Sequence, residues 1–412
     1  LDASARSLRF FLVDVGSCKT LVALFAMLYA VEAGTQAALM APTDILANQH
    51  FATLQKFAGD AVNIVLLTGR DKGKKRQEIL DKISSGQADI IVGTHALFSE
   101  DVTFKDLALT VIDEQHKFGV HQRLSLSEKG TKSDMLVMTA TPIPRTLALT
   151  CYGDMDVSQI DELPPGRKEI ATRVLPAARL DEVAAALGRS LADGNKAYWV
   201  CPLVEESEKI DLAAAEQRFE YLSRLYPNRV GLVHGKMKSA EKDAIMQKFA
   251  GNELDILVAT TVIEVGVDVP AATVMVIEHS ERFGLAQLHQ LRGRIGRGQK
   301  ASTCLLLYTD PLGETAKARL TAMRETQDGF KIAEQDLILR GAGEVLGTKQ
   351  SGLPEFKIAD LAAHTDLLKM ASNDAKYIMN IDPELKSERG KALRVLLYLF
   401  GKDEAVKALK AG

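Results

Sequence analysis

The chain has 412 residues, of which 46% are hydrophobic and 25% charged, and its formal net charge is −3. This composition is typical of a globular protein of two or three domains. The longest apolar run, 21–31, is too short to cross a bilayer, and the four cysteines lie too far apart in the sequence to indicate a metal site. We therefore expect a cytoplasmic protein without disulfides and without a membrane partner.

The first part of the chain alternates short apolar runs with longer helical patterns. Strands are expected at 10–15, 37–41, 62–67, 90–93, 109–113 and 135–139, with helices such as 19–33 and 74–84 between them. Such an alternation predicts a parallel, doubly wound sheet with helices on both faces.

The second part repeats this alternation after a break at 161–166, where the sequence DELPPG interrupts regular structure. Strands are expected at 197–201, 230–234, 256–259, 274–278 and 303–308. Beyond residue 310 the pattern becomes mainly helical, with a glycine-rich break at 340–352. We predict an α/β fold with two tandem parallel-sheet domains, 1–163 and 167–309, and a helical segment, 310–412.

The sequence FLVDVGSCKT passes from the first predicted strand into the first predicted helix. A phosphate-binding loop reads GxxxxGK[ST], and its backbone N–H groups cradle phosphates at a helix N-terminus. Lys19 and Thr20 match the end of this pattern and Gly16 lies within it, but Val13 and Cys18 stand at the two glycine positions. Taken alone, the segment fits a phosphate-binding loop and an ordinary strand–helix turn about equally well.

A second motif, VIDEQH, ends an apolar strand in two carboxylates, Asp113 and Glu114. In a parallel sheet they lie at the carboxyl edge, beside the first motif. Asp113 could hold Mg²⁺ through water, and Glu114 could orient an attacking water. The alternative is an acidic helix start, where the positive end of the helix dipole stabilises carboxylates.

A third motif, QLHQLRGRIGR, carries arginines that include Arg294 and Arg297. Phosphoryl transfer requires positively charged groups beside the γ-phosphate, because they stabilise its transition state. Solvated arginines on a surface helix are the alternative, but they do not explain the glycines of the GRIGR core, which are unfavourable within a helix.

The order of these motifs resembles that of a superfamily-two helicase, and three longer stretches resemble the RecG family in particular. The helicase motifs are APT (41–43), GTHAL (93–97), DEQH (113–116), TATPIPRT (139–146), ATTVIEVGVDVP (259–270) and QLRGRIGRG (290–298). The stretches typical of RecG are DEQHKFGVHQR (113–123), AYWVCPLVEES (197–207) and RGAGEVLGTKQSGLPEF (340–356), the last similar to the family's translocation motif.

This resemblance implies two RecA-like domains, ATP and Mg²⁺ as cofactors, and DNA as the partner. The DNA would be the double-stranded arms of stalled forks and four-way junctions. A single-stranded DNA-binding protein is a further candidate partner, and a monomer is expected. A family helicase also has an N-terminal wedge domain that engages the branch point, and no segment of this sequence resembles it.

The resemblance also assigns roles to individual residues. It implies hydrolysis by Glu114, Gln290, Arg294 and Arg297, nucleotide binding by Gly16, Ser17, Lys19, Thr20 and Asp113, and Mg²⁺ binding by Thr20 and Asp113. Coupling of hydrolysis to movement is implied for His116, Thr139, Thr141, Arg340 and Gln350. DNA binding is implied for Pro42, Thr43, Gly93, Thr94, His95, Thr260 and Thr261.

Two other functions are compatible with parts of the sequence. Val13 and Cys18 depart from the family's loop, which predicts weak ATP binding and favours a DNA-binding module that does not use nucleotide. A motor similar to the transcription–repair coupling factor, which acts on RNA polymerase, shares the translocation motif in looser form. The DEQH and GTKQSG details favour RecG over that relative.

Overall fold

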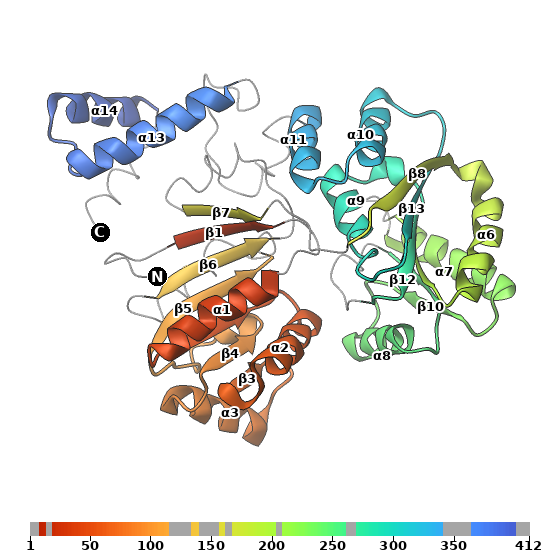
Figure 1. Cartoon of the computed structure of the whole chain (residues 1–412), viewed down its shortest axis with the longest axis horizontal. Helices are drawn as coiled ribbons and strands as arrows, with labels where there is room; N and C mark the ends of the chain where they lie inside the picture. Colours follow the sequence, from red (N-terminus) through yellow and green to blue (C-terminus); the bar gives the residue numbers. More distant parts are fainter. Residues whose placement is uncertain are drawn as a thin grey trace. The chain divides into compact units, whose positions relative to one another are not determined.

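Two sheets of parallel strands, with helices in the connections between strands, form the framework that carries the predicted motifs (Figure 1). The computed structural model describes residues 8–13, 19–114, 133–139, 156–160, 167–202, 208–260, 269–340 and 364–400. The predicted fold class, tandem parallel-sheet α/β domains followed by helices, is confirmed.

The first sheet has seven strands in the order β3-β4-β2-β5-β6-β1-β7, all parallel. Its strands are β1 (Leu8–Val13), β2 (Gln36–Met40), β3 (Ile64–Leu67), β4 (Ile90–Gly93), β5 (Leu107–Asp113), β6 (Asp134–Thr139) and β7 (Asp156–Ile160). The described helical elements between them are α1 (Lys19–Glu32), α2 (Asp44–Ala58), η1 (Gly59–Ala61), α3 (Gly73–Ser85) and η2 (His95–Phe98). All five residues of β2 and all four of β4 are buried, as expected for strands covered on both faces.

The second sheet has six strands in the order β10-β11-β9-β12-β13-β8, again all parallel. Its strands are β8 (Ile170–Pro176), β9 (Lys196–Val200), β10 (Val230–Val233), β11 (Ile256–Ala259), β12 (Ala272–Ile277) and β13 (Ser302–Tyr308). The helical elements of this part are η4 (Ala177–Arg179), α6 (Leu180–Ala192), α7 (Glu208–Leu225), α8 (Ser239–Ala250), η6 (Ser280–Arg282) and α9 (Leu285–Arg292).

Among the described residues, four helices follow the second sheet along the chain: α10 (Glu314–Glu325), α11 (Gly329–Arg340), α13 (Thr365–Ile381) and α14 (Glu388–Leu399). Leu320 and Met323 of α10 and Ile332 of α11 are buried in the core of the second sheet. The helices α13 and α14 belong to a separate compact unit. The predicted domain boundaries stay predictions.

The strands were predicted to within three residues at either end, with two omissions. Ile90–Gly93 and Ile256–Ala259 have the predicted bounds, whereas β7 and β8 were not predicted. Both missed strands lie at a sheet edge and have few fully buried residues, so they lack the continuous apolar runs by which the other strands were identified.

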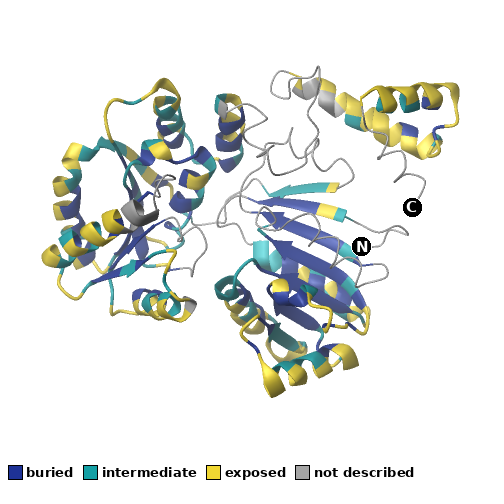
Figure 2. Ribbon diagram, turned by 180° about the vertical axis from the view of Figure 1, so that it is seen from behind, coloured by how far each residue is buried: buried dark blue, intermediate teal, exposed yellow. Residues whose placement is uncertain are grey.

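Burial follows the layers of the fold (Figure 2). The central strands of each sheet are buried along most of their length, and the helices are exposed on their outer faces. One side of α1 packs Ala23, Leu24 and Met27 into the core of the first sheet, while Phe25 is 62% exposed on its other side. No helix among the described residues is long and apolar enough to span a membrane.

Candidate functional site

The carboxyl edge of the first sheet brings the first two motifs together. Lys19 is the first residue of α1, which follows β1, and Asp113 is the last residue of β5. Lys19 Nζ lies 2.7 Å from Asp113 Oδ1 and 2.8 Å from Glu114 Oε1. The lysine is therefore held by both carboxylates, although 94 residues separate it from Asp113.

The backbone at Glu114 helps to create this arrangement. Glu114 has a φ of 53°, in the left-handed region that residues other than glycine seldom occupy. Its backbone N–H donates to Asp113 Oδ1 at 3.1 Å. Such a conformation costs on the order of 1 to 3 kcal/mol and is found more often at functional sites than elsewhere. In this conformation the Glu114 carboxylate reaches Lys19, as that of Asp113 does.

His50 is a third partner of Asp113, and the sequence analysis did not identify it. Its Nε2 lies 2.8 Å from Asp113 Oδ2, and the two side chains are 7% and 1% exposed. A helical spacing signal was available, because Ala47, His50 and Leu54 form the buried face of α2. That spacing does not reveal which strand the ring contacts.

Electrostatics at this edge favour the charged forms of the pair. Burial by itself lowers the pKa of Lys19, but the carboxylates of Asp113 and Glu114 outweigh it, so the pKa of Lys19 is raised above its ordinary value. Burial likewise raises the pKa of Asp113, but Lys19 and His50 outweigh it and hold that pKa well below its usual range. The site is thus a buried, compensated cluster of charges.

Val13 lies within the strand predicted at 10–15, at the point where we expected the strand to turn into the loop. It is the last residue of β1, paired with Ile160 of β7 and fully buried in the core of the first sheet. Its extended backbone suits a β-branched residue, and the weak ATP binding expected from this position stays a prediction. Gly16, Ser17 and Cys18 lie outside the described residues.

The segments predicted to contact DNA lie at strand ends and a helix start. Thr43 is the N-cap of α2, where its hydroxyl accepts from Leu46 N at 3.4 Å. Gly93 ends β4, and a Cβ there would collide with the Leu67 carbonyl oxygen, so this close approach requires glycine. His95, in η2, is exposed.

Thr94 and Thr260 occupy equivalent places in the two sheets. Thr94 follows β4 and Thr260 follows β11, and each of these strands is second in its sheet's order. Both hydroxyls are buried without a hydrogen-bond partner among the described residues. Thr139, predicted to couple hydrolysis to movement, ends β6 beside Leu12 of β1.

The arginine motif belongs to the second sheet domain. Gln290 lies in α9 and is partly exposed, as are Arg294 and Arg297 beyond the helix end. Arg297 Nε donates to the Gly293 carbonyl at 3.2 Å. These three residues share one segment, as predicted, and their catalytic roles stay predictions.

Arg292, in the same motif, has a structural role that the sequence analysis missed. It is 2% exposed, and its Nη1 donates to the carbonyls of Met323 at 2.7 Å and Thr326 at 3.0 Å. These carbonyls end α10, where a positive charge also favours the helix dipole. Arg292 therefore connects α9 to the C-terminal end of α10.

The structure describes only some of the other predicted site residues. His116, Thr141, Thr261 and Gln350 lie outside the described residues, and Arg340 ends α11. Pro42 and Thr20 are partly exposed at the same edge of the first sheet, after β2 and at the start of α1. Within the described ranges, no group of three or more His, Cys, Asp and Glu side chains is arranged to hold a metal ion.

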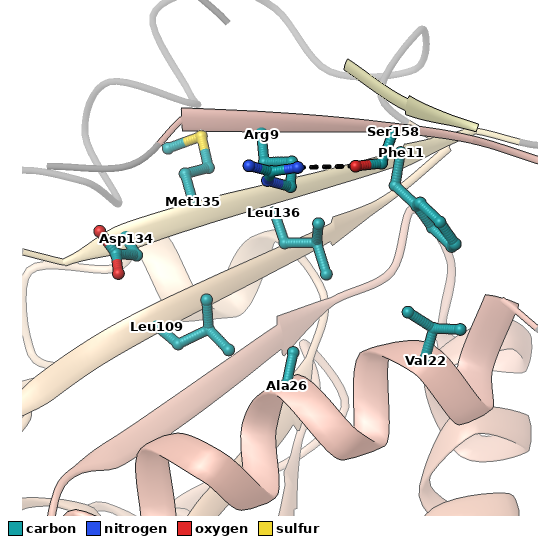
Figure 3. A pocket seen from close by; sticks show the side chains of 9 residues that line it. All are labelled: Arg9, Phe11, Val22, Ala26, Leu109, Asp134, Met135, Leu136 and Ser158. Carbon is teal, nitrogen blue, oxygen red and sulfur yellow. Dashed lines mark hydrogen bonds between the residues drawn. The ribbon is translucent and has the colours of Figure 1, made fainter. Parts of the chain in front are cut away.

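A cavity beside α1 is separate from this edge (Figure 3). Its lining consists of Arg9, Phe11, Val22, Ala26, Leu109, Asp134, Met135, Leu136 and Ser158. Two of these lining residues are bonded to each other, since Arg9 Nη1 donates to Ser158 Oγ at 2.7 Å. None of the predicted site residues lines this cavity, so we do not regard it as the nucleotide site.

Comparison with known families divides the chain into three consecutive matches. Residues 9–150 match the DEAD/DEAH box helicase family, and residues 178–299 match the helicase conserved C-terminal domain. Residues 326–398 match the C-terminal part of domain 3 of the ATP-dependent DNA helicase RecG.

Individual relatives agree with the third match. Proteins named ATP-dependent DNA helicase RecG from Pasteurella multocida and Bacillus subtilis are 53% and 50% identical, over 91% and 94% of this chain. The matches cover 55% and 57% of those relatives, so the chain spans about half of their length.

Solved structures show the same similarity. A structure of RecG bound to a three-way DNA junction superposes with a TM-score of 0.73 at 47% identity, covering 89% of this chain and 48% of that one. Yeast Dbp5, solved with RNA and ADP BeF3, is only 16% identical, with a TM-score of 0.58 over 83% of this chain and 85% of that one, and shares the fold alone.

Proposed function

This chain belongs to the RecG family of ATP-dependent DNA helicases, and from that premise we propose that it is an ATP-driven motor acting on branched DNA. The proposed substrates are the double-stranded arms of stalled forks and four-way junctions. The reaction would be ATP hydrolysis coupled to movement along DNA. The observation that carries this proposal is the cluster of Lys19, Asp113 and Glu114 at the carboxyl edge of the first sheet, with distances of 2.7 and 2.8 Å.

This cluster suits a triphosphate that carries Mg²⁺. Lys19 would exchange its two carboxylates for the β- and γ-phosphates, helped by Gly16 and Ser17. The hydroxyl of Thr20 and the carboxylate of Asp113 are oxygen donors of the kind that Mg²⁺ prefers, and they would hold it. Bound Mg²⁺ would neutralise charge on the phosphates.

Hydrolysis itself would depend on charge and orientation from both sheet domains. Glu114 would orient the attacking water and accept its proton, because its turned backbone places the carboxylate beside Lys19. Gln290, Arg294 and Arg297 would stabilise the charge that develops on the γ-phosphate. Domain closure would bring the two sets of groups together.

DNA contact and coupling are assigned to the remaining predicted residues. Segments at Pro42–Thr43, Gly93–His95 and Thr260–Thr261 would contact the phosphate backbone through N–H groups, without reading base sequence. Coupling of hydrolysis to movement is proposed for His116, Thr139, Thr141, Arg340 and Gln350. The similarity to a structure that holds a three-way junction supports DNA as the partner.

The departures of the phosphate-binding loop favour a second candidate, a DNA-binding module that does not use nucleotide. Val13 is accommodated in β1, so Cys18 is the departure that bears on this alternative. A coupling-factor-like motor is less compatible with the RecG domain that residues 326–398 match.

Hydrolysis of ATP by the chain, with and without forked DNA, decides between the first two candidates. The motor predicts hydrolysis that DNA stimulates and that Lys19→Met abolishes. Tight DNA binding without ATP binding, measured by titration with a fluorescent ATP analogue, would instead support the nucleotide-independent module.

A further inference from the structure

The helix α2 connects two parts of the proposed motor within one sheet domain. It begins at its N-cap Thr43, in the segment proposed to contact DNA, and its buried face consists of Ala47, His50 and Leu54. Seven residues separate Thr43 from His50, which corresponds to roughly 10 Å along a helix. One rigid element therefore carries both the proposed DNA contact and a side chain that reaches Asp113.

The contact between His50 and Asp113 is well defined. A carboxylate oxygen can only accept, so Nε2 of His50 carries the proton and donates to Asp113 Oδ2 at 2.8 Å. The other oxygen of Asp113 accepts from Lys19 Nζ and from the backbone N–H of Glu114. Each oxygen therefore has its own partners. His50 and Lys19 together hold the carboxylate in one orientation.

We propose that His50 is a positioning residue that holds the Asp113 carboxylate in orientation and transmits DNA contact at the start of α2 to the nucleotide site. This inference rests on the proposed function, because it assigns Asp113 to Mg²⁺ and the Thr43 segment to DNA. A displacement of α2 on DNA binding would move His50 and therefore turn Asp113, which changes how well the site binds nucleotide with Mg²⁺.

An ordinary buried histidine would behave differently. If His50 only filled space in the core, its replacement would lower stability and would leave the Mg²⁺ dependence and the response to DNA unchanged. The Mg²⁺ dependence and the response to DNA therefore separate the two possibilities.

Three substitutions in the full chain provide this separation. His50→Leu removes the donor and keeps an apolar side chain on the buried face. His50→Gln keeps a side-chain N–H near the position of Nε2, so it should restore the contact. Leu54→Ala, one turn further along the same face, is the matched control, because Leu54 is fully buried but is not a partner of Asp113.

The first measurement is the Mg²⁺ concentration that gives half-maximal binding of a fluorescent ATP analogue. We expect His50→Leu to raise it about tenfold, as is typical when a group that orients a metal ligand is removed. His50→Gln and Leu54→Ala should stay close to the parent. The same His50→Leu chain should bind linear duplex DNA normally, while the ratio of ATP hydrolysis with DNA to hydrolysis without DNA falls toward one.

A second measurement requires no nucleotide. A double-mutant cycle of His50→Leu and Asp113→Asn compares unfolding equilibrium constants from urea titration. The effect of the double substitution should differ by about tenfold or more from the product of the two single effects, because a buried contact joins the residues. If the parent chain binds no ATP, the proposed function fails, and this cycle alone decides whether His50 positions Asp113. Additive effects in the cycle, an unchanged Mg²⁺ dependence in His50→Leu, or an equal loss of DNA stimulation in Leu54→Ala would overturn the inference.

Discussion

Lys19 and Asp113 form an ion pair in which the carboxylate is buried, with Lys19 Nζ 2.7 Å from Asp113 Oδ1, and the pKa of Asp113 is lowered as a result. A carboxylate whose pKa is lower in the folded than in the unfolded state stabilises the fold above its unfolded pKa of about 3.9. That contribution is lost as the pH falls from there through the folded pKa.

Acid unfolding should therefore depend on Asp113. We expect the free energy of unfolding of the parent chain, from urea titrations at a series of pH values, to fall steeply below about pH 4. Asp113→Asn should be less stable at neutral pH and should show a shallower fall. Asp60→Asn, a change at an exposed position in η1, is the control and should keep the parent's slope. Equal slopes in all three proteins would contradict this linkage.

Glycine at Val13 and at Cys18, the two departures from the phosphate-binding motif, should have two separate effects. Val13→Gly removes a fully buried side chain from a strand, so we expect it to lower the free energy of unfolding by about 2 to 4 kcal/mol. Cys18→Gly should instead tighten ATP binding, because glycine lets the loop backbone approach phosphates closely. Urea unfolding and ATP titration of each single variant test whether Val13 affects stability and Cys18 affects ATP binding. These assignments are wrong if Val13→Gly is as stable as the parent or if Cys18→Gly binds ATP no more tightly.

Glu114 and Arg297 should act in hydrolysis and contribute little to stability. Glu114→Gln and Arg297→Ala are each expected to lower DNA-stimulated ATP hydrolysis by at least about a hundredfold. Their melting temperatures should stay within about 2 °C of the parent, because Glu114→Gln keeps a side-chain oxygen that can accept from Lys19 and because Arg297 is partly exposed. Hydrolysis at the parent's rate in either variant would remove that residue from the catalytic set.

DNA affinity should fall steeply as salt rises. Contacts to the phosphate backbone release counterions, so the logarithm of the binding constant should decrease linearly with the logarithm of the salt concentration between about 50 and 200 mM. Duplexes of different base sequence should bind alike, because these contacts carry no sequence information. Fluorescence anisotropy measures both quantities, and a binding constant that does not change with salt is incompatible with the proposed contacts.

Arg292 should be required for stability. Its Nη1 donates to two carbonyls at the end of α10 while its Nη2 lies 3.2 Å from His289 Nδ1, and the single ammonium of a lysine cannot occupy both nitrogen positions. We expect Arg292→Lys to lower the free energy of unfolding by about 2 to 3 kcal/mol. Arg189→Lys, at an exposed position of α6, is the matched control and should be neutral. Equal stability of the two variants would show that the carbonyl contacts contribute little.

The sequence by itself determined the fold class, the family and most of the strands. Continuous apolar runs such as Ile90–Gly93 identify strands that are buried on both faces, because such strands contact helices on each side. Long motifs in a fixed order identified the family. Both kinds of evidence are local in the chain and can be read without knowing which strands are neighbours.

Only the tertiary structure decided which side chains meet. Parallel strands do not pair in chain order here: β5 lies between β2 and β6, so Asp113 meets Lys19 from 94 residues away and His50 from 63 residues away. The pairing partner of Val13 was likewise decided by the tertiary structure, because β7, a half-buried edge strand without an apolar run, pairs with β1 up to its last residue. A motif template gives a residue's spacing along the chain, whereas hydrogen bonding and burial depend on neighbours that the crossovers bring from elsewhere in the chain.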